Sequence, residues 1–144
     1  MVKEQARERW LDHVRREDEI ASLSAHLSAA TAHWLELVWE LRDDADSSDF
    51  AGFLAWRCGL TRREANEYLR VADALQELPA IRAAFGRGEV TFTKVRALSR
   101  VATPDSEERL LELAGVLTAS QLERALRAFR RLAVEEARET HELE

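Results

Sequence analysis

The chain has 144 residues, of which 46% are hydrophobic and 33% charged, and its formal net charge is −6. This length is sufficient for one domain with a buried core, and the composition is that of a globular protein. The acidic balance argues against indiscriminate binding to nucleic acid. The charged start MVKEQARERW does not have the pattern of a secretory signal, and the absence of a run of about 18 apolar residues predicts no membrane span.

The residue usage predicts an all-α protein. Ala, Leu, Glu and Arg dominate, whereas the chain has only 5 Gly and 2 Pro. We expect a bundle of about six to seven helices, with a long N-terminal helix and a central helix-turn-helix. The single Cys58 cannot form an internal disulfide, so we expect it to be reduced, at the end of a core helix in a cytoplasmic protein.

The N-terminal third is predicted to be one long helix or a pair of helices. A charge-dense segment over residues 2–18 precedes a stretch whose apolar residues recur every three or four positions: Ile20, Leu23, Leu27, Ala30, Trp34, Leu37, Val38 and Leu41. Ile20, Leu27, Trp34 and Leu41 repeat every seven residues, which is typical of a helix that packs against another helix. The stretch is therefore either a core helix of its own domain or the seam of a homodimer.

An acidic segment without large apolar residues, Asp43–Asp49, predicts a linker after this helix. Ser48 or Asp49 can cap the helix that follows. We therefore divide the chain into an N-terminal part, residues 1–47, and a helical core, residues 48–144.

Residues 50–75 have the pattern of a helix-turn-helix. A short apolar helix ends at Gly59, where a left-handed backbone carries little steric penalty for glycine. Thr61 and Glu64 then form a predicted capping box for the second helix. The side chains expected on the buried side of that helix are Ala65, Leu69 and Ala72, with Tyr68 beside them.

The outward side of the second helix is the candidate DNA-contacting surface. It carries Thr61, Arg62, Arg63, Asn66, Glu67 and Arg70. Arg can fork onto guanine and Asn onto adenine, and Arg or Thr can hold phosphates. Residues 57–100 contain 9 basic and 5 acidic side chains, so the middle third is positive in an acidic chain. The alternative is that these residues are only the solvated side of a core helix.

Four further helices are expected after residue 75. The first runs from Pro79 to Phe85 and is closed by glycines. The second is capped by Thr91 and leaves three cations toward solvent, namely Lys94, Arg96 and Arg100. The third starts at Thr103-Pro104 and the last at Thr118.

The sequence contains none of the short motifs that mark common active sites. It has no Gly-rich phosphate loop, no Cys-x-x-Cys, no His-Glu-x-x-His and no Gly-x-Ser-x-Gly. We therefore expect no catalysis by this chain alone, no metal or other cofactor and no small-molecule substrate.

Residues 53 to about 138 resemble domain of unknown function 222, also called the 13E12 repeat family. The most specific matching string is GEVTFTKVRALSRVATP. In that family the domain commonly precedes a zinc-dependent HNH endonuclease module in actinobacterial proteins, which implies a link to DNA cleavage or mobile elements. The paired cysteines and histidine-rich core of that module are absent here. The resemblance therefore implies an accessory part, a shortened version or a stand-alone relative, and supplies no catalytic residue.

The order of elements from GLTRREANEYLRVADAL to LTASQLERALRAF also looks like the helix-turn-helix core of ParB-type partition proteins. That resemblance places Thr61, Arg62, Arg63, Asn66 and Arg70 on the groove-facing side of the recognition helix. Lys94-Val95-Arg96-Ala97-Leu98 stands where those proteins have His-Ala-Arg-Ala-Leu.

The leading hypothesis is a DNA-binding, non-catalytic domain of an HNH-endonuclease-type protein that reads duplex DNA. Its candidate contact residues are Thr61, Arg62, Arg63, Asn66, Arg70, Lys94 and Arg96. The alternative is a helical dimerisation or protein-interaction module that binds no nucleic acid. An enzyme with an unrecognised site is the third hypothesis.

Overall fold

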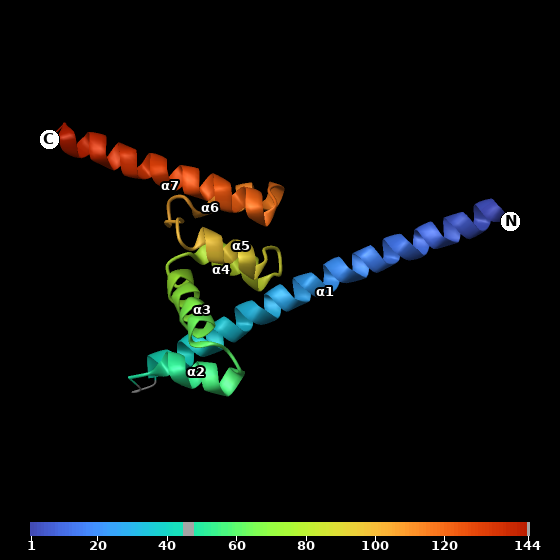
Figure 1. Ribbon diagram of the computed structural model, residues 1–144, viewed down its shortest axis with the longest axis horizontal. Helices are drawn as coiled ribbons and strands as arrows, with labels where there is room; N and C mark the ends of the chain where they lie inside the picture. Colours follow the sequence, from blue (N-terminus) through green and yellow to red (C-terminus); the bar gives the residue numbers. More distant parts are fainter. Residues whose placement is uncertain (45–47, 144) are drawn as a thin grey trace.

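The structure is a computed structural model that describes residues 1–44 and 48–143 (Figure 1). These residues form seven α-helices and no strand: α1 (Val2–Asp44), α2 (Phe50–Cys58), α3 (Arg62–Leu75), α4 (Pro79–Gly86), α5 (Phe92–Leu98), α6 (Glu107–Val116) and α7 (Ala119–Glu142). The predicted all-α class and helix number are confirmed. Residues 45–47, which include part of the predicted linker and its boundary, lie outside the described residues. None of the described helices is long and apolar enough to cross a membrane.

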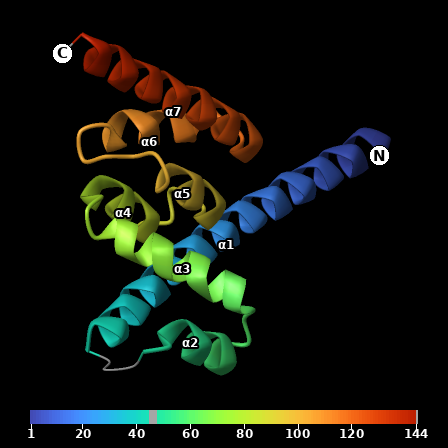
Figure 2. The ribbon, with the colours of Figure 1, turned by 60° about the vertical axis from the view of Figure 1, so that its left-hand side comes forward.

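The N-terminal part is one continuous helix of 43 residues rather than a pair. Figures 1 and 2 show that its C-terminal half crosses the body and its N-terminal half extends away from it. The body-facing side is formed by Ser28, Ala32, Leu35 and Val38, which are buried. Before Ala25, all residues of α1 are exposed apart from the half-buried Val14.

The core consists of two apolar clusters, and both α1 and α3 contribute to each of them. The larger cluster joins α1 to α3, α4, α5, α6 and α7 around fully buried side chains such as Phe85, Ile81 and Leu98. The smaller cluster packs α2 onto α1 and α3 through Phe50, Leu54, Val38, Ala65 and Leu69. Because α3 contributes to both clusters, burial of its apolar side orients the helix relative to the rest of the body.

The predicted helix ends agree closely with the structure. Asp49 caps α2, and Gly59 ends it with φ of 68°. Thr61 and Glu64 form the capping box of α3, and Thr91 and Thr118 cap α5 and α7. One expectation was wrong in detail: α6 starts at Glu107, because Thr103 to Ser106 form a hydrogen-bonded turn. Cys58 is the last residue of α2, as predicted, and its side chain is exposed.

A buried carboxylate links α6 to the start of α4. Glu107 is 3% exposed, and its Oε1 accepts a hydrogen bond from the backbone N–H of Ile81 at 2.9 Å. Leu78, the N-cap residue of α4, has an apolar side chain that cannot accept a hydrogen bond from this N–H. Glu107 therefore satisfies a donor that would otherwise be left unpaired at the helix start, where a negative charge is favourable.

Gly88 allows α1 to pass close to the turn after α4. Its φ is 75°, and a Cβ at this position would lie 2.4 Å from the carbonyl oxygen of Ala25 in α1. Neither the left-handed backbone nor the contact tolerates a side chain. At Gly86, two residues earlier, an added Cβ would meet nothing within 4 Å.

We predict that Gly88→Ala destabilises the chain by more than about 2 kcal/mol, because it combines backbone strain with a backbone clash. Gly86→Ala is the matched control and should change the free energy of unfolding by less than about 1 kcal/mol. Urea denaturation followed by circular dichroism measures both. Equal effects of the two substitutions would contradict the close approach of α1 to Gly88.

Candidate nucleic-acid interface

The helix pair α2–α3 has the connection expected of a helix-turn-helix. Gly59 is left-handed and Leu60 is half-buried against the smaller cluster, so the chain turns sharply into α3. The apolar side of α3 is buried, which leaves Arg62, Arg63 and Asn66 exposed on its N-terminal half. In helix-turn-helix proteins this half of the second helix carries the base-contacting residues.

Arg62 is held by a carboxylate from the start of α2. Its Nη1 and Nη2 donate to Oδ1 and Oδ2 of Asp49 at 2.8 and 2.9 Å. The Arg62 hydrogen bonds, together with one from the Gly52 N–H, lower the pKa of Asp49 to about 2. Both side chains are more than half exposed, and exposed ion pairs contribute only about 0–1 kcal/mol. A ligand anion could therefore compete for this guanidinium.

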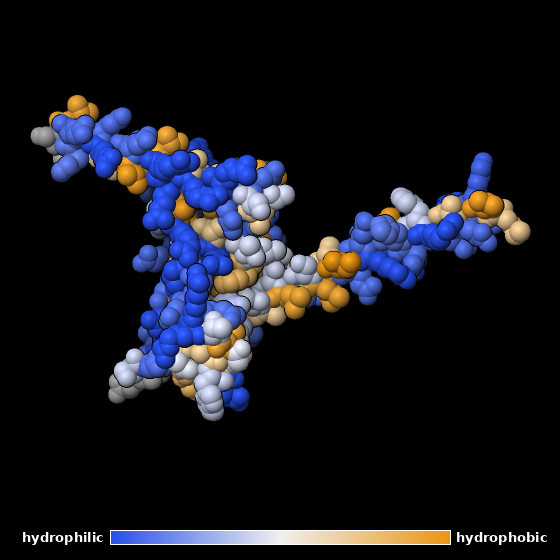
Figure 3. Space-filling view, viewed as in Figure 1, coloured by the Kyte–Doolittle hydropathy of each residue, from blue (hydrophilic) through white to orange (hydrophobic). Residues whose placement is uncertain are grey.

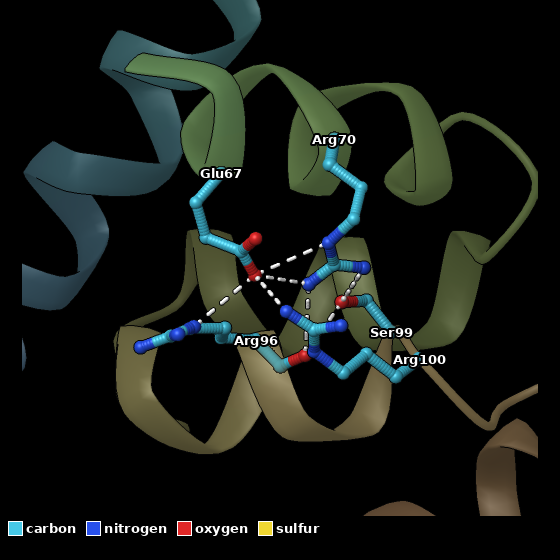
Figure 4. Close-up of polar contacts among 5 residues, drawn as sticks. All are labelled: Glu67, Arg70, Arg96, Ser99 and Arg100. Carbon is cyan, nitrogen blue, oxygen red and sulfur yellow. Dashed lines mark hydrogen bonds and ion pairs between the residues drawn. The ribbon is translucent and has the colours of Figure 1, made fainter. Parts of the chain in front are cut away.

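A second carboxylate, Glu67, gathers three arginines from α3 and the α5 region (Figure 4). Its Oε1 accepts hydrogen bonds from Arg70 at 2.6 Å, from Arg100 at 3.0 Å and from Arg96 at 3.1 Å. Arg70 also donates to Ser99 Oγ and to the Arg96 carbonyl, which brings it toward α5 and away from solvent. The hydrogen bond from Arg70, followed by the charges and hydrogen bonds of Arg96 and Arg100, lowers the pKa of Glu67 to about 2.

Lys94 does not point freely into solvent as the sequence suggested. Its Nζ donates to the carbonyl oxygens of Ala114 and Leu117, each at 2.7 Å. These carbonyls lie at the C-terminal end of α6, where a cation satisfies unpaired acceptors. Lys94 therefore ties α5 to α6, and we leave it out of the candidate interface.

The seven predicted contact residues thus separate into four groups. Arg63 and Asn66 are exposed, and no described carboxylate forms an ion pair with Arg63. Arg62 and Arg96 are exposed but paired, whereas Arg70 and Lys94 are half-buried and engaged within the body. Thr61 accepts a hydrogen bond from the Glu64 N–H as the cap of α3.

A larger cationic surface adjoins Arg63. Three neighbouring surface hollows share lining residues. The first lies beside α3 and shares Arg96 and Arg100 with the second, a hollow of about 260 Å³ between α5 and α7. The second shares Arg127 and Arg130 with the third, which lies along α7. Together these adjoining hollows form one stretch of surface, which we call the arginine trough. Its arginines are Arg63, Arg96, Arg100, Arg127, Arg130, Arg131 and Arg138.

The arginine trough is positive on a chain that is negative overall. Seven arginines and four glutamates line it, an excess of three positive charges. Among the residues that the structure describes, no carboxylate forms an ion pair with Arg127 or Arg130. In Figure 3, hydrophilic atoms form a band over the body from α7 to α3. The trough can therefore bind an extended anion through guanidinium groups.

The sequence reasoning missed most of the trough because its two walls are 30 residues apart. One signal was present: Arg127, Arg130, Arg131 and Arg138 recur at helical spacing along one side of α7. Arg96 and Arg100 do the same over one turn. Only the fold brings α5 and α7 side by side.

Comparison with known proteins identifies no relative: no family model, no curated protein and no solved structure matches this chain. Within residues 1–44 and 48–143, no group of three or more His, Cys, Asp and Glu side chains is arranged to hold a metal ion.

Glu67 predicts a specific dependence of stability on pH. Its pKa is lowered in the folded chain, so its ionised form stabilises the fold above the ordinary pKa of about 4.5. That contribution is lost as the pH falls toward about 2. At pH 7, Glu67→Gln should lower the free energy of unfolding by about 1 kcal/mol, and the difference from the parent should vanish near pH 2. Glu77→Gln, at an exposed position outside this cluster, should have no such effect in chemical denaturation.

Proposed function

We propose that the chain is a non-catalytic DNA-binding domain that holds the phosphate backbone of a duplex in the arginine trough. The observation that carries this proposal is the continuity of seven arginines from Arg63 on α3 to Arg138 on α7. Arg63 lies at one end of this surface, and Arg62 and Asn66 lie beside it on the N-terminal half of α3; these three are the candidates for contact with bases.

The residue type favours phosphate as the ligand. Guanidinium groups bind phosphate oxygens through two parallel hydrogen bonds and are less strongly hydrated than lysine. Arginines along α7 from Arg127 to Arg138 span about 16 Å at 1.5 Å per residue, which matches several successive phosphates of one strand. The acidic remainder of the chain limits attachment elsewhere on the surface.

The proposed role differs from the one expected from the helix-turn-helix alone. Phosphate contacts supply affinity and position, and base contacts supply specificity. Because Arg70 and Lys94 are engaged inside the body, base contacts rest on the first turns of α3 only. We therefore propose backbone binding with limited sequence preference, in keeping with an accessory domain of an HNH-type nuclease and with the expected cytoplasmic location.

We predict that the parent binds duplex DNA with an affinity that falls steeply with salt, with a slope of about −3 to −5 in a plot of log K against log salt. Replacing both Arg127 and Arg130 by Ala should weaken binding about tenfold and reduce the slope by about 2, since each contacts one phosphate. Fluorescence anisotropy with a labelled duplex measures both quantities.

The matched control replaces Arg15 and Arg16 by Ala, which removes the same charge from an exposed part of α1. Its affinity should stay within about twofold of the parent. Glu67→Gln should act in the opposite direction, because it removes the negative charge that Arg96 and Arg100 share, and should strengthen binding. Equal losses in the trough and control variants, or no binding by the parent, would contradict the proposal.

A further inference from the structure

The exposed side of α1 carries an apolar stripe with a seven-residue repeat. Four of its members are strongly exposed: Ile20 at 70%, Leu23 at 56%, Leu27 at 70% and Leu41 at 52%. Leu37 and Ala30 are exposed as well, so the complete stripe, here called the α1 seam, comprises Ile20, Leu23, Leu27, Ala30, Trp34, Leu37 and Leu41. These positions alternate in steps of three and four, as the first and fourth positions of a coiled-coil heptad do. Figure 3 shows apolar atoms along α1 where the helix leaves the bundle.

The body uses another side of the same helix. Ser28, Ala32 and Leu35 face the core, and none belongs to the seam. Trp34 is the exception within the seam, because it is half-buried and its ring meets Tyr68 edge-on at 4.9 Å. A helix covered on one side only by its own body leaves the seam accessible over about 33 Å, from Ile20 to Leu41.

The charges beside the seam favour a second copy of this chain as the occupant. Between Glu19 and Glu40, which flank the two ends of the seam, the flanking heptad positions are Ser24, His26, Thr31, His33 and Val38. None of these five is an acid, lysine or arginine, and Val38 is buried by the body. Two identical stripes therefore bring carboxylates beside the interface only at its two ends, although the chain as a whole is acidic. A partner recognised by opposite charge would find only Glu19 and Glu40 to pair with along these flanks, whereas a self-complementary stripe suits a two-fold interface.

We propose that two copies of the chain dimerise by packing their α1 seams together as a short coiled coil. Burial of the exposed leucines and Ile20 supplies the driving force. The interface would also support α1 where it leaves the body, over residues 20–24, since a lone helix without tertiary contacts is marginal in water. The proposal does not depend on DNA, because the seam shares no residue with the arginine trough.

Light scattering across a wide range of protein concentration tests the proposal. The parent should have twice the chain mass at high concentration. Replacing Leu23 and Leu27 by Glu should yield a folded monomer, because four carboxylates would then face one another across the interface. Both positions are exposed in the single chain, so circular dichroism of the body should be retained.

The matched control replaces Ala21 and Ser22 by Glu, which adds the same charge at exposed positions beside the seam. It should remain a dimer. A parent that is monomeric at every concentration overturns the proposal and leaves a different protein as the occupant. A folded, dimeric Leu23→Glu and Leu27→Glu double variant also overturns it and would point to another face, such as the exposed apolar end of α7.

Discussion

Burial of the apolar side of α3 is the constraint on which the rest of the structure depends. Leu69 and Ala65 join this helix to α2, and Val71, Ala72 and Leu75 join it to the larger cluster. The helix α1 also contributes to both clusters, through Leu35 and Val38, so α1 and α3 together join the two parts of the body. The same burial limits the number of α3 side chains that could contact a ligand, because only one narrow side of the helix is exposed to solvent. Two of the cations on that side, Arg62 and Arg70, have carboxylate partners from the chain itself.

Helix caps and turns could be predicted from the sequence where a few neighbouring residues determine them. The turn at Gly59, the capping box of Thr61 and Glu64, and the caps at Asp49 and Thr118 depend on contacts within four residues, and the structure has all of them. The start of α6 was misplaced because a Thr-Pro pair can begin either a helix or a turn. Here, Ser106 hydrogen-bonds to Thr103 and closes a turn first.

Side-chain partners that come from distant segments could not be predicted in this way. Whether an arginine on the outer side of a helix is free or paired depends on the segment that packs beside it. Arg70 donates hydrogen bonds to Ser99 and to the Arg96 carbonyl, which are 29 and 26 residues away in the sequence. The same holds for Lys94, whose hydrogen-bond partners lie at the distant C-terminal end of α6. The periodicity of apolar residues also did not determine which side of α1 packs against the body. The body buries Ala32, Leu35 and Val38, whereas Ile20, Leu27 and Leu41 of the seven-residue repeat are exposed.

Charge and oligomeric state bear on each other in this chain. On the proposed function, a trough with an excess of three positive charges, on a molecule of net charge −6, would have modest affinity for a polyanion as a single copy. A dimer would carry two such troughs, and the second contact would form at the high effective concentration set by a short helical connection. Any benefit requires that both troughs reach the same duplex. Because α1 is one uninterrupted helix from the seam into the core, the dimer contact would orient both bodies relative to each other. Geometry, more than local charge, would then determine how tightly and where DNA is held.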